Sequence, residues 1–378
     1  MRILLLINSK AAPFPQQRAE PAQRPVLDYH ALAHGLAAHL GASVDMLDHQ
    51  AVLQSRDPRV RLARATAGLN AAVGLLAFLR RDGYDAVFTI GESVGIPLAL
   101  LLRAVRPRPC HVTIGHRMTA PKKRIFYKLL RVHGAMDRIL VYSAFQRESA
   151  RRGWNADEKT IHLIPYCVDA TFFQPKWEGT VREEQICSIG SEWRDHDTLL
   201  RAMDALPGMT LKLTAFSPWT KGASRIDQNK LPANVEARRY EYVELRELYE
   251  ASALCVVPLR DADFAAGITA IIEAMAMGKP VITTATVGRH PDLVRDGENG
   301  LLVPPHDAQA LVRAIRRLSE DAELRSRMGI RARQWVEKNA TVEHWVGHIA
   351  HAIQTSLQAM PASARYRTSG ELPQKPWS

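Results

Sequence analysis

Residues 265–305 read AAGITAIIEAMAMGKPVITTATVGRHPDLVRDGENGLLVPP, and this stretch is the most informative part of the 378-residue chain. A glycine at position 267 begins an apolar helical pattern that runs to residue 277, and a β-branched strand pattern follows at 280–283. Free backbone N–H groups at such a helix start, with no Cβ in the way, can receive a diphosphate. Glu273 lies within the otherwise apolar helix, where a carboxylate is costly unless a polar group pairs with it.

Short apolar strand patterns alternate with helical patterns on the N-terminal side of this stretch, which indicates parallel sheets built from βα units. The first series of predicted strands covers 2–7, 43–47, 85–90, 110–114, 138–142 and 161–164, with helices at 27–40, 59–81, 94–105, 121–132 and 144–152. The second series has strands at 186–189, 209–214, 253–257 and 280–283, with helices at 196–205, 243–251 and 267–277. Because the alternation restarts, we predict an α/β protein with two doubly wound, Rossmann-like domains that face each other across a ligand-binding cleft.

The domain boundaries follow from this restart. We predict an N-terminal domain at 1–170, a linker at 171–184 that contains Pro175 and several charges, and a C-terminal domain at 185–341. A helix at 342–358 is predicted to pack back on the N-terminal domain. Residues 359–378 are polar and contain prolines, which predicts a flexible tail.

Composition indicates a globular protein, with 46% hydrophobic and 24% charged residues. No run approaches the roughly 18 apolar residues of a membrane-spanning helix, and the apolar run at the N-terminus is too short for a signal peptide. The four cysteines show no Cys-x-x-Cys spacing, which favours buried reduced thiols and offers no metal site. We therefore expect a cytoplasmic protein.

The net charge of +11 is confined to the first half of the chain. Residues 1–173 hold 24 Lys and Arg against 13 Asp and Glu, whereas the remainder holds 26 of each. One interpretation is that these charges are merely solvated. The other is that the N-terminal half meets an anionic partner, such as lipid head groups at the inner face of a membrane or a diphosphate-linked acceptor. Nucleic acid is not expected, because no nucleic-acid-binding motif is present and aromatic residues are not interleaved with the basic ones.

The stretch 265–305 resembles the nucleotide-sugar-binding core of retaining glycosyltransferases of family 4, the glycosyl transferases group 1, which have the GT-B fold. The matching motifs are Gly267, Glu273-Ala274-Met275-Ala276, Gly278-Lys279-Pro280-Val281 and Asn299-Gly300-Leu301-Leu302-Val303. The resemblance extends over about residues 85–340. It implies transfer of a sugar from a nucleotide-sugar donor to a saccharide or lipid-linked acceptor with retention of anomeric configuration, without a metal or a cofactor.

The resemblance also implies roles for individual residues. Donor binding would involve Gly190, Arg194, Arg239, Tyr240, Gly267, Ile268, Thr269 and Glu273, with Arg194 on the diphosphate and Glu273 on the ribose. His116 and Glu273 are the predicted catalytic residues, and His116 matches the histidine that the family places near the donor sugar. Arg117, Lys122, Lys123 and Arg124 are candidates for contact with an acceptor phosphate or a membrane.

Two positions depart from the family pattern. Relatives usually carry a glutamate where this chain has Ala265, and Asp261 or Asp263 are candidate substitutes. Relatives also place an arginine directly after the first glycine, where this chain has Ser191. Arg194 is therefore the candidate diphosphate ligand, with Lys221 and Arg225 as weaker alternatives.

Each role has a structural alternative. Glu273 could pair with a nearby Arg or Lys, Arg194 could pair with Asp195 or Asp197, and His116 could be a surface loop residue. The helix at 59–81 either packs on its own sheet or docks on an anionic bilayer. Two other functions also remain open, a nucleotide-sugar epimerase of the same fold and a nucleotide-sugar-binding protein without turnover.

Overall fold

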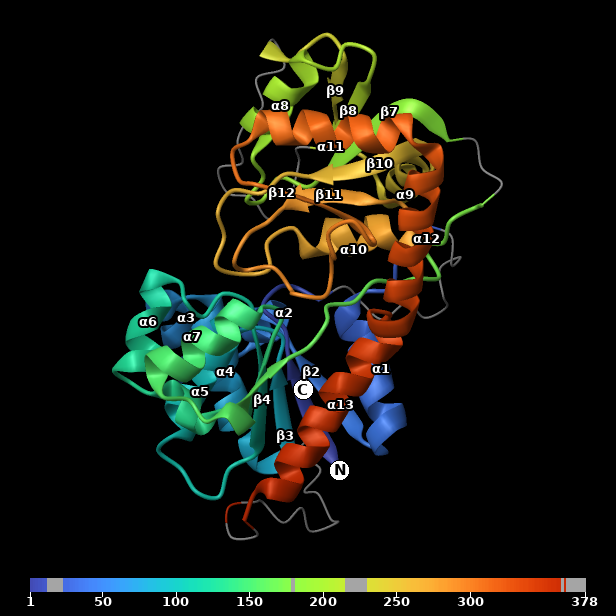
Figure 1. Ribbon diagram of the computed structural model, residues 1–378. Helices are drawn as coiled ribbons and strands as arrows, with labels where there is room; N and C mark the ends of the chain where they lie inside the picture. The colour runs from blue at the N-terminus through green and yellow to red at the C-terminus, as the bar shows by residue number, and fades with distance from the viewer. Residues whose placement is uncertain (12–22, 178–180, 215–229, 362–363, 365–378) are drawn as a thin grey trace.

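The computed structural model describes residues 1–11, 23–177, 181–214, 230–361 and 364. It shows two α/β domains, each built on a parallel sheet flanked by helices (Figure 1). The predicted fold class is confirmed. Lys221, Arg225 and most of the predicted tail at 359–378 lie outside the described residues.

The N-terminal sheet has the strand order β2-β1-β3-β4-β5-β6, and all of its neighbouring strands are parallel. Its central strands are almost entirely buried because helices cover both faces, and their sequences RILLL, AVFT and CHVTIG are mostly apolar. The strands are β1 Arg2–Leu6, β2 Ser43–Leu47, β3 Ala86–Thr89, β4 Cys110–Gly115, β5 Arg138–Val141 and β6 Ile161–Leu163. The helices are α1 Asp28–Leu40, α2 His49–Gln54, α3 Pro58–Ala67, α4 Leu69–Leu79, α5 Glu92–Leu102, α6 Pro121–Lys128 and α7 Ala144–Trp154.

The C-terminal sheet repeats this architecture with the order β12-β11-β10-β7-β8-β9, again parallel throughout. Its strands are β7 Arg182–Ile189, β8 Thr210–Thr214, β9 Val235–Ala237, β10 Ser252–Val257, β11 Val281–Thr284 and β12 Gly300–Val303. Its helices are α8 His196–Asp204, α9 Tyr242–Ala251, α10 Ile268–Ala276, α11 Ala308–Glu320 and α12 Ala322–Asn339. Helix α10 lies on the side of this domain that faces the N-terminal domain (Figure 1).

The single helix predicted at 59–81 is wrong, because two helices, α3 and α4, occupy this region. They meet at Gly68, whose φ of +85° and ψ of 175° are not helical. Helix α4 contributes Ala72, Val73 and Leu76 to the core and packs against α5, which agrees with the alternative of packing on the domain itself. Helix α3 buries only Val60 among its residues.

Helix α13 (Val342–Ala359) returns from the C-terminal domain and lies along the N-terminal domain, in contact with α1 and β4 (Figure 1). Trp345 is almost fully buried there, and its indole Nε1 donates a hydrogen bond of 3.0 Å to the hydroxyl of Tyr142. Where the chain crosses between the domains, the backbone N–H of Val168 donates to the carbonyl of Ala340 at 3.0 Å. The two crossing segments are thus hydrogen-bonded to each other.

Candidate functional site

The N-terminus of α10 and the loop after β7 bring two glycines close to one arginine side chain in the C-terminal domain. Gly267 precedes α10 with a φ of +72°, and Gly190 follows β7 with a φ of +89°. A Cβ at Gly190 would lie 2.7 Å from Nη2 of Arg194, and a Cβ at Gly267 would lie 3.2 Å from its Nη1. Both glycines therefore contact one guanidinium, and the free N–H groups of the first turn of α10 lie beside it.

Arg194 is a buried cation without a carboxylate partner in the described part of the chain. Its Nε and Nη2 donate to the carbonyl of Ile189 at 3.0 and 2.8 Å, and its Nη1 donates to the carbonyl of Glu192 at 2.9 Å. Burial lowers the pKa of Arg194 to about 10. Among the described residues Arg194 forms no ion pair with Asp195 or Asp197, because its Nε, Nη1 and Nη2 donate to backbone carbonyls instead.

Glu273 lies on the next turns of α10, and its environment disfavours the charged form. Burial raises the pKa of Glu273 to about 7, against the opposing effects of the Tyr249 hydroxyl and the Arg194 charge. The Tyr249 hydroxyl donates to Oε2 at 3.0 Å. No salt bridge of Glu273 to an Arg or Lys is present within the described residues, so the alternative of a surface ion pair is not supported. Tyr249 was not predicted, because a tyrosine within the α9 pattern is indistinguishable from a core residue.

The remaining residues predicted on the donor side differ in their surroundings. Ile268 packs against the apolar cluster of the N-terminal domain, and Thr269 is exposed. Arg239 is largely exposed, and its Nε lies 3.3 Å from a carboxylate oxygen of Glu241. The ring of Tyr240 is covered instead by the guanidinium of Arg238, 3.8 Å from the ring centre. The structure thus gathers Gly190, Arg194, Gly267 and Glu273 into one group and shows no contact that links Arg239 to it.

His116 lies directly after β4, where its loop is fixed by Glu92 at the N-terminus of α5. Oε2 of Glu92 accepts the backbone N–H of His116 at 2.9 Å, and Oε1 accepts the N–H of Arg117 at 2.8 Å. Nε2 of His116 lies 2.9 Å from the carbonyl oxygen of Ile90, so Nε2 carries a proton and donates to this carbonyl. The exposed imidazole can therefore bind a hydroxyl group.

Glu92 was missed by the sequence prediction, although it is only 2% exposed. Burial opposes its ionisation, but His116, Lys123 and the backbone N–H groups outweigh this effect and lower the pKa of Glu92 to about 2. Nζ of Lys123 lies 2.6 Å from Oε1 of Glu92. The sequence signal that could have revealed Glu92 is a strand pattern followed by a glycine and then by an acidic residue at the start of a helix.

The four basic residues predicted to meet an acceptor or a membrane are divided by the structure. Arg117 turns toward the C-terminal domain, and Lys123 pairs with buried Glu92. Lys122 and Arg124 are exposed on α6. Two of the four are therefore exposed cations, and contact of the group with an acceptor or a membrane stays a prediction.

Ala265 stands where a glutamate was expected, and it packs against the apolar cluster of the N-terminal domain together with Ile268. The carboxylate of Asp263, one of the two candidate substitutes, is engaged by Arg117 and Thr119. Asp261 is exposed. The structure therefore offers no free carboxylate at Asp263 to replace the missing one.

Asp28, in the first turn of α1, is a second acidic residue that the sequence reasoning missed. Its Oδ1 accepts the backbone N–H of Tyr29 at 2.8 Å. Burial raises the pKa of Asp28, while the Tyr29 hydrogen bond and the charge of His116 lower it. Asp28 also acts electrostatically on Tyr242 of the C-terminal domain, as Glu273 does. The electrostatic effect on the pKa of Tyr242 thus comes from carboxyl groups of both domains.

Two further observations concern metals and membranes. In residues 1–11, 23–177, 181–214, 230–361 and 364, no cluster of three or more His, Cys, Asp or Glu side chains could hold a metal ion. Among the described helices, none has both the length and the apolar character needed to cross a membrane.

Two Rossmann-like domains, each built on a parallel sheet, define the GT-B class of fold. Solved structures agree. Sucrose-phosphate synthase from Thermosynechococcus elongatus aligns with a TM-score of 0.72 and 21% identity over 95% of this chain and all of that one. Anabaena Alr3699/HepE, solved in complex with UDP and glucose, aligns with a TM-score of 0.66 and 17% identity over 94% of this chain and all of that one.

Residues 186–335 match the family model of the glycosyl transferases group 1. D-inositol 3-phosphate glycosyltransferase of Nocardia farcinica is 27% identical over 284 residues, which cover 68% of this chain and 59% of the relative. The enzyme of the same name from Streptomyces bingchenggensis is 42% identical over 95 residues, 25% of this chain and 20% of the relative. The chain thus aligns with 20% and 59% of the length of these curated relatives.

Proposed function

We propose that the protein is a glycosyltransferase that uses a nucleotide-sugar donor and retains the anomeric configuration. The observation that carries the proposal is the buried guanidinium of Arg194, which contacts Gly190 and Gly267 beside the N-terminus of α10 and has no carboxylate partner among the described residues. A diphosphate would supply the missing negative charge. Because positive charge at this place stabilises a leaving nucleoside diphosphate, the same group would lower the barrier to sugar transfer.

Glu273 complements this anion site. A carboxylate next to Arg194 and Tyr249 can accept hydrogen bonds from ribose hydroxyls, which would satisfy a group that is otherwise costly to bury. His116, from the opposite domain, would present its exposed imidazole to a hydroxyl of the sugar or the acceptor. The proposal places the donor between the domains, with its nucleotide on the C-terminal side.

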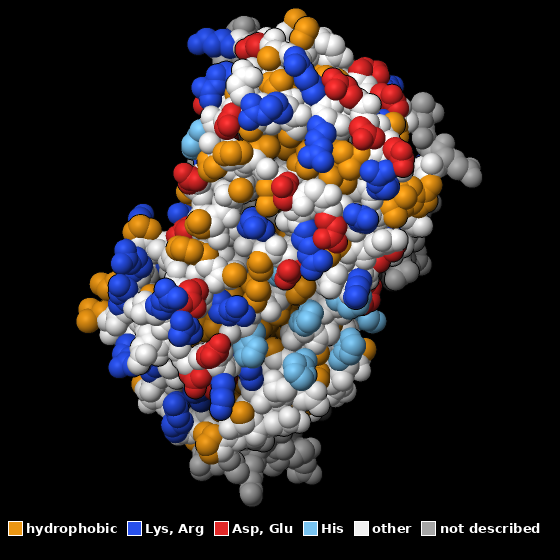
Figure 2. All heavy atoms as spheres, viewed as in Figure 1, with side chains coloured by type: hydrophobic (Ala, Val, Ile, Leu, Met, Phe, Trp, Pro, Cys, Tyr) orange, Lys and Arg blue, Asp and Glu red, His pale blue; other side chains and the backbone are white. Residues whose placement is uncertain are grey.

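The proposed acceptor is anionic and is a saccharide or a lipid-linked intermediate. The excess positive charge of the chain falls in its first 173 residues. Figure 2 shows Lys and Arg side chains over both domains, including a group at the lower left, where α6 and α7 lie in Figure 1. The relatives are named for an inositol phosphate, which is also anionic. Inositol 3-phosphate is therefore the first acceptor to test.

Calorimetric titration tests the donor site. UDP-glucose, which is named in a solved complex of Alr3699/HepE, is the first donor to try, followed by other uridine, guanosine and adenosine diphosphate sugars. We expect binding of one of them, which Glu273→Ala and Arg194→Met weaken and the exposed control Asp261→Ala does not. If the wild-type protein binds none of these compounds, the donor-site assignment is wrong.

We also propose that α6 contacts an anionic membrane surface. Lys122, Arg124 and Lys128 are exposed on this helix, next to Ile125 and Leu129, whose side chains are 53% and 72% exposed. Exposed apolar residues among cations are typical of a helix that lies in the lipid interface. Sedimentation with vesicles of phosphatidylglycerol should deplete the protein, whereas pure phosphatidylcholine should not. Leu129→Glu should abolish the depletion, and equal sedimentation of wild type and variant would contradict the proposal.

An epimerase is the second candidate, because burial raises the pKa of Tyr242 and the carboxyl groups of Glu273 and Asp28, one from each domain, raise it further. An epimerase in which one of these carboxylates removes the proton from the carbon that is inverted, and a proton from solvent is added to the other face, would form a product that carries deuterium at that carbon in deuterated water. A transferase leaves the carbon-bound hydrogens of the sugar unchanged. Mass spectrometry of the donor after incubation without acceptor separates the two activities.

A further inference from the structure

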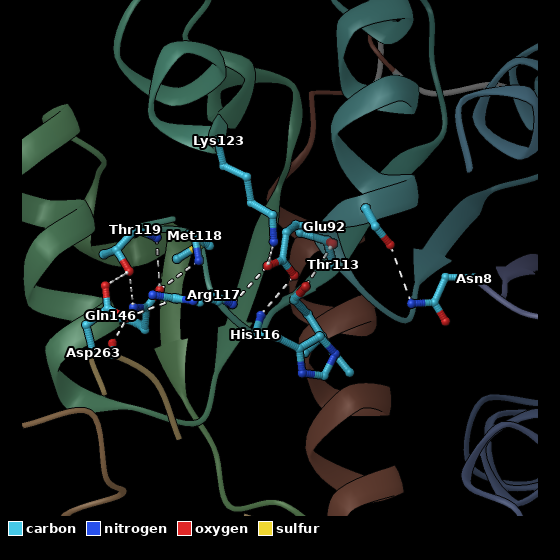
Figure 3. A network of polar contacts seen from close by, with 12 residues as sticks. Asn8, Glu92, Thr113, His116, Arg117, Met118, Thr119, Lys123, Gln146 and Asp263 are labelled. Atoms are coloured by element: carbon cyan, nitrogen blue, oxygen red, sulfur yellow. Dashed lines mark hydrogen bonds and ion pairs between the residues drawn. The ribbon is translucent and has the colours of Figure 1, made fainter. Parts of the chain in front are cut away.

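Asp263 is the point at which three side chains of the N-terminal domain meet the C-terminal domain (Figure 3). It lies in the loop between β10 and α10. Its Oδ1 accepts a hydrogen bond from Nε of Arg117 at 3.1 Å, and its Oδ2 accepts one from the hydroxyl of Thr119 at 2.6 Å. Its backbone carbonyl accepts a third, from Nε2 of Gln146 at 2.5 Å. One residue thus uses both its side chain and its backbone to join the domains.

The N-terminal side of this contact is fixed in advance by two buried side chains. Glu92 binds the backbone N–H groups of His116 and Arg117, as described above. Gln146 is fully buried, and its Oε1 accepts the backbone N–H of Met118 at 2.8 Å. Because the loop 116–119 cannot move without breaking these hydrogen bonds, it presents Arg117 and Thr119 in a defined orientation (Figure 3).

The C-terminal side of the contact includes both loops of the proposed donor site. The guanidinium of Arg117 lies over the ring of Trp193, 4.5 Å from its centre, and over the ring of Phe264, 4.9 Å from its centre. Trp193 directly precedes Arg194 in the loop after β7, and Phe264 follows Asp263 in the loop that leads to Gly267. A single cation of the N-terminal domain therefore contacts both loops that carry the anion-binding residues.

We propose that Asp263 is a positioning residue that latches the two domains together and thereby aligns the His116 loop with the donor loops. The latch is the set of contacts among Asp263, Arg117, Thr119 and Gln146. Closure of the domains by this latch does not depend on which ligand binds. Its effect on donor affinity rests on the function proposed above.

This assignment explains why Asp263 does not replace the glutamate missing at Ala265. Both carboxylate oxygens of Asp263 are already hydrogen-bonded to the N-terminal domain, so neither is directed at a sugar. Ala265, two residues later, packs against the apolar cluster of the opposite domain. In this chain the segment from 263 to 265 joins the domains by a polar contact and then an apolar one.

Pulsed electron paramagnetic resonance measures the closure directly. Spin labels at Arg61→Cys on α3 and Arg313→Cys on α11 report the distance between the domains, because both positions are exposed and the four native cysteines are buried. We expect one dominant distance in the protein with native Asp263. Asp263→Ala should add a longer distance and lower the closed-to-open ratio about tenfold, as expected for losing an ion pair and a hydrogen bond.

Matched variants separate the latch from a general loss of structure. Asp261→Ala removes an exposed carboxylate of the same loop and should leave the distance distribution unchanged. Asp263→Glu keeps the charge and should retain most of the closed population. An Asp263→Ala protein with the same distance distribution as the native latch would overturn the proposal.

Donor binding is the second readout. For a nucleotide sugar that the wild-type protein binds, Asp263→Ala should raise the Kd about twofold, since a closed-to-open ratio that falls from about 10 to about 1 roughly halves the fraction of closed protein. If Asp263→Ala opens the domains but leaves the Kd unchanged, the proposed coupling between the latch and the donor loops is wrong. If no nucleotide sugar binds the wild type, the proposed function fails, whereas the distance measurement still decides whether the latch exists.

Discussion

Replacement of Glu273 by glutamine should make the protein more stable at high pH than the wild type. The pKa of Glu273 is raised from 4.5 to about 7 in the folded protein, chiefly by burial. The native state therefore holds this proton more tightly than the unfolded state, and the free energy of unfolding falls as the pH rises from about 4.5 to about 7. The full shift corresponds to about 3 kcal/mol, and partial solvent access to the carboxyl group reduces this to about 1–3 kcal/mol.

Urea unfolding followed by circular dichroism at pH 5 and at pH 8 provides the measurement. Contributions from the other titrating groups cancel in the difference between Glu273→Gln and wild type, because glutamine cannot ionise. We expect this difference to move by about 1–3 kcal/mol in favour of the variant between the two pH values. A difference that stays constant from pH 5 to pH 8 would refute the argument that burial holds Glu273 near neutrality.

Three further substitutions test other parts of the site. Arg194→Met should weaken binding of the nucleotide sugar about 10- to 100-fold in calorimetry, because charged hydrogen bonds to the diphosphate are lost; unchanged affinity would exclude Arg194 from the donor site. Glu92→Gln should lower the free energy of unfolding by about 2 kcal/mol at pH 7. The carboxylate of Glu92 has a pKa of about 2, so it stabilises the fold above pH 4.5, and this stabilisation is lost as the pH falls through 2. A urea-unfolding difference at pH 7 that is no larger than at pH 3 would contradict this. Gly267→Ala should cost about 2 kcal/mol in urea unfolding, because its φ is +72° and its Cβ would lie 2.9 Å from a methyl group of Leu259; unchanged stability would show that the turn relaxes.

The fold could be predicted because the signals that define it are local. Strand and helix patterns alternate at the proper spacing, and the restart after the linker identifies the second domain. The break between α3 and α4 could not be predicted from the same signals, because the helical pattern continues on both sides of Gly68 and only the backbone conformation shows that it ends there. A glycine within an apolar helical pattern is tolerated too often to mark a break.

The site could be predicted in part, for a related reason. Arg194, Gly267 and Glu273 lie in motifs that the sequence displays, and the structure brings them together. Glu92 acts through residues 24 to 31 positions later in the chain, and only the tertiary structure brings them to it. The role of Asp263 depends on the other domain altogether, so no local pattern could reveal it.

The return of α13 to the N-terminal domain affects the order in which the protein can be assembled on the ribosome. Residues 342–359 cover α1 and β4, so the N-terminal domain is completed only after the entire C-terminal domain has been synthesised. At about 5–20 residues per second, the delay between Val168 and Val342 is roughly 10 to 35 s. During that interval the apolar surface that later receives Trp345 has no partner from its own chain, which makes the nascent N-terminal domain a natural client for a chaperone.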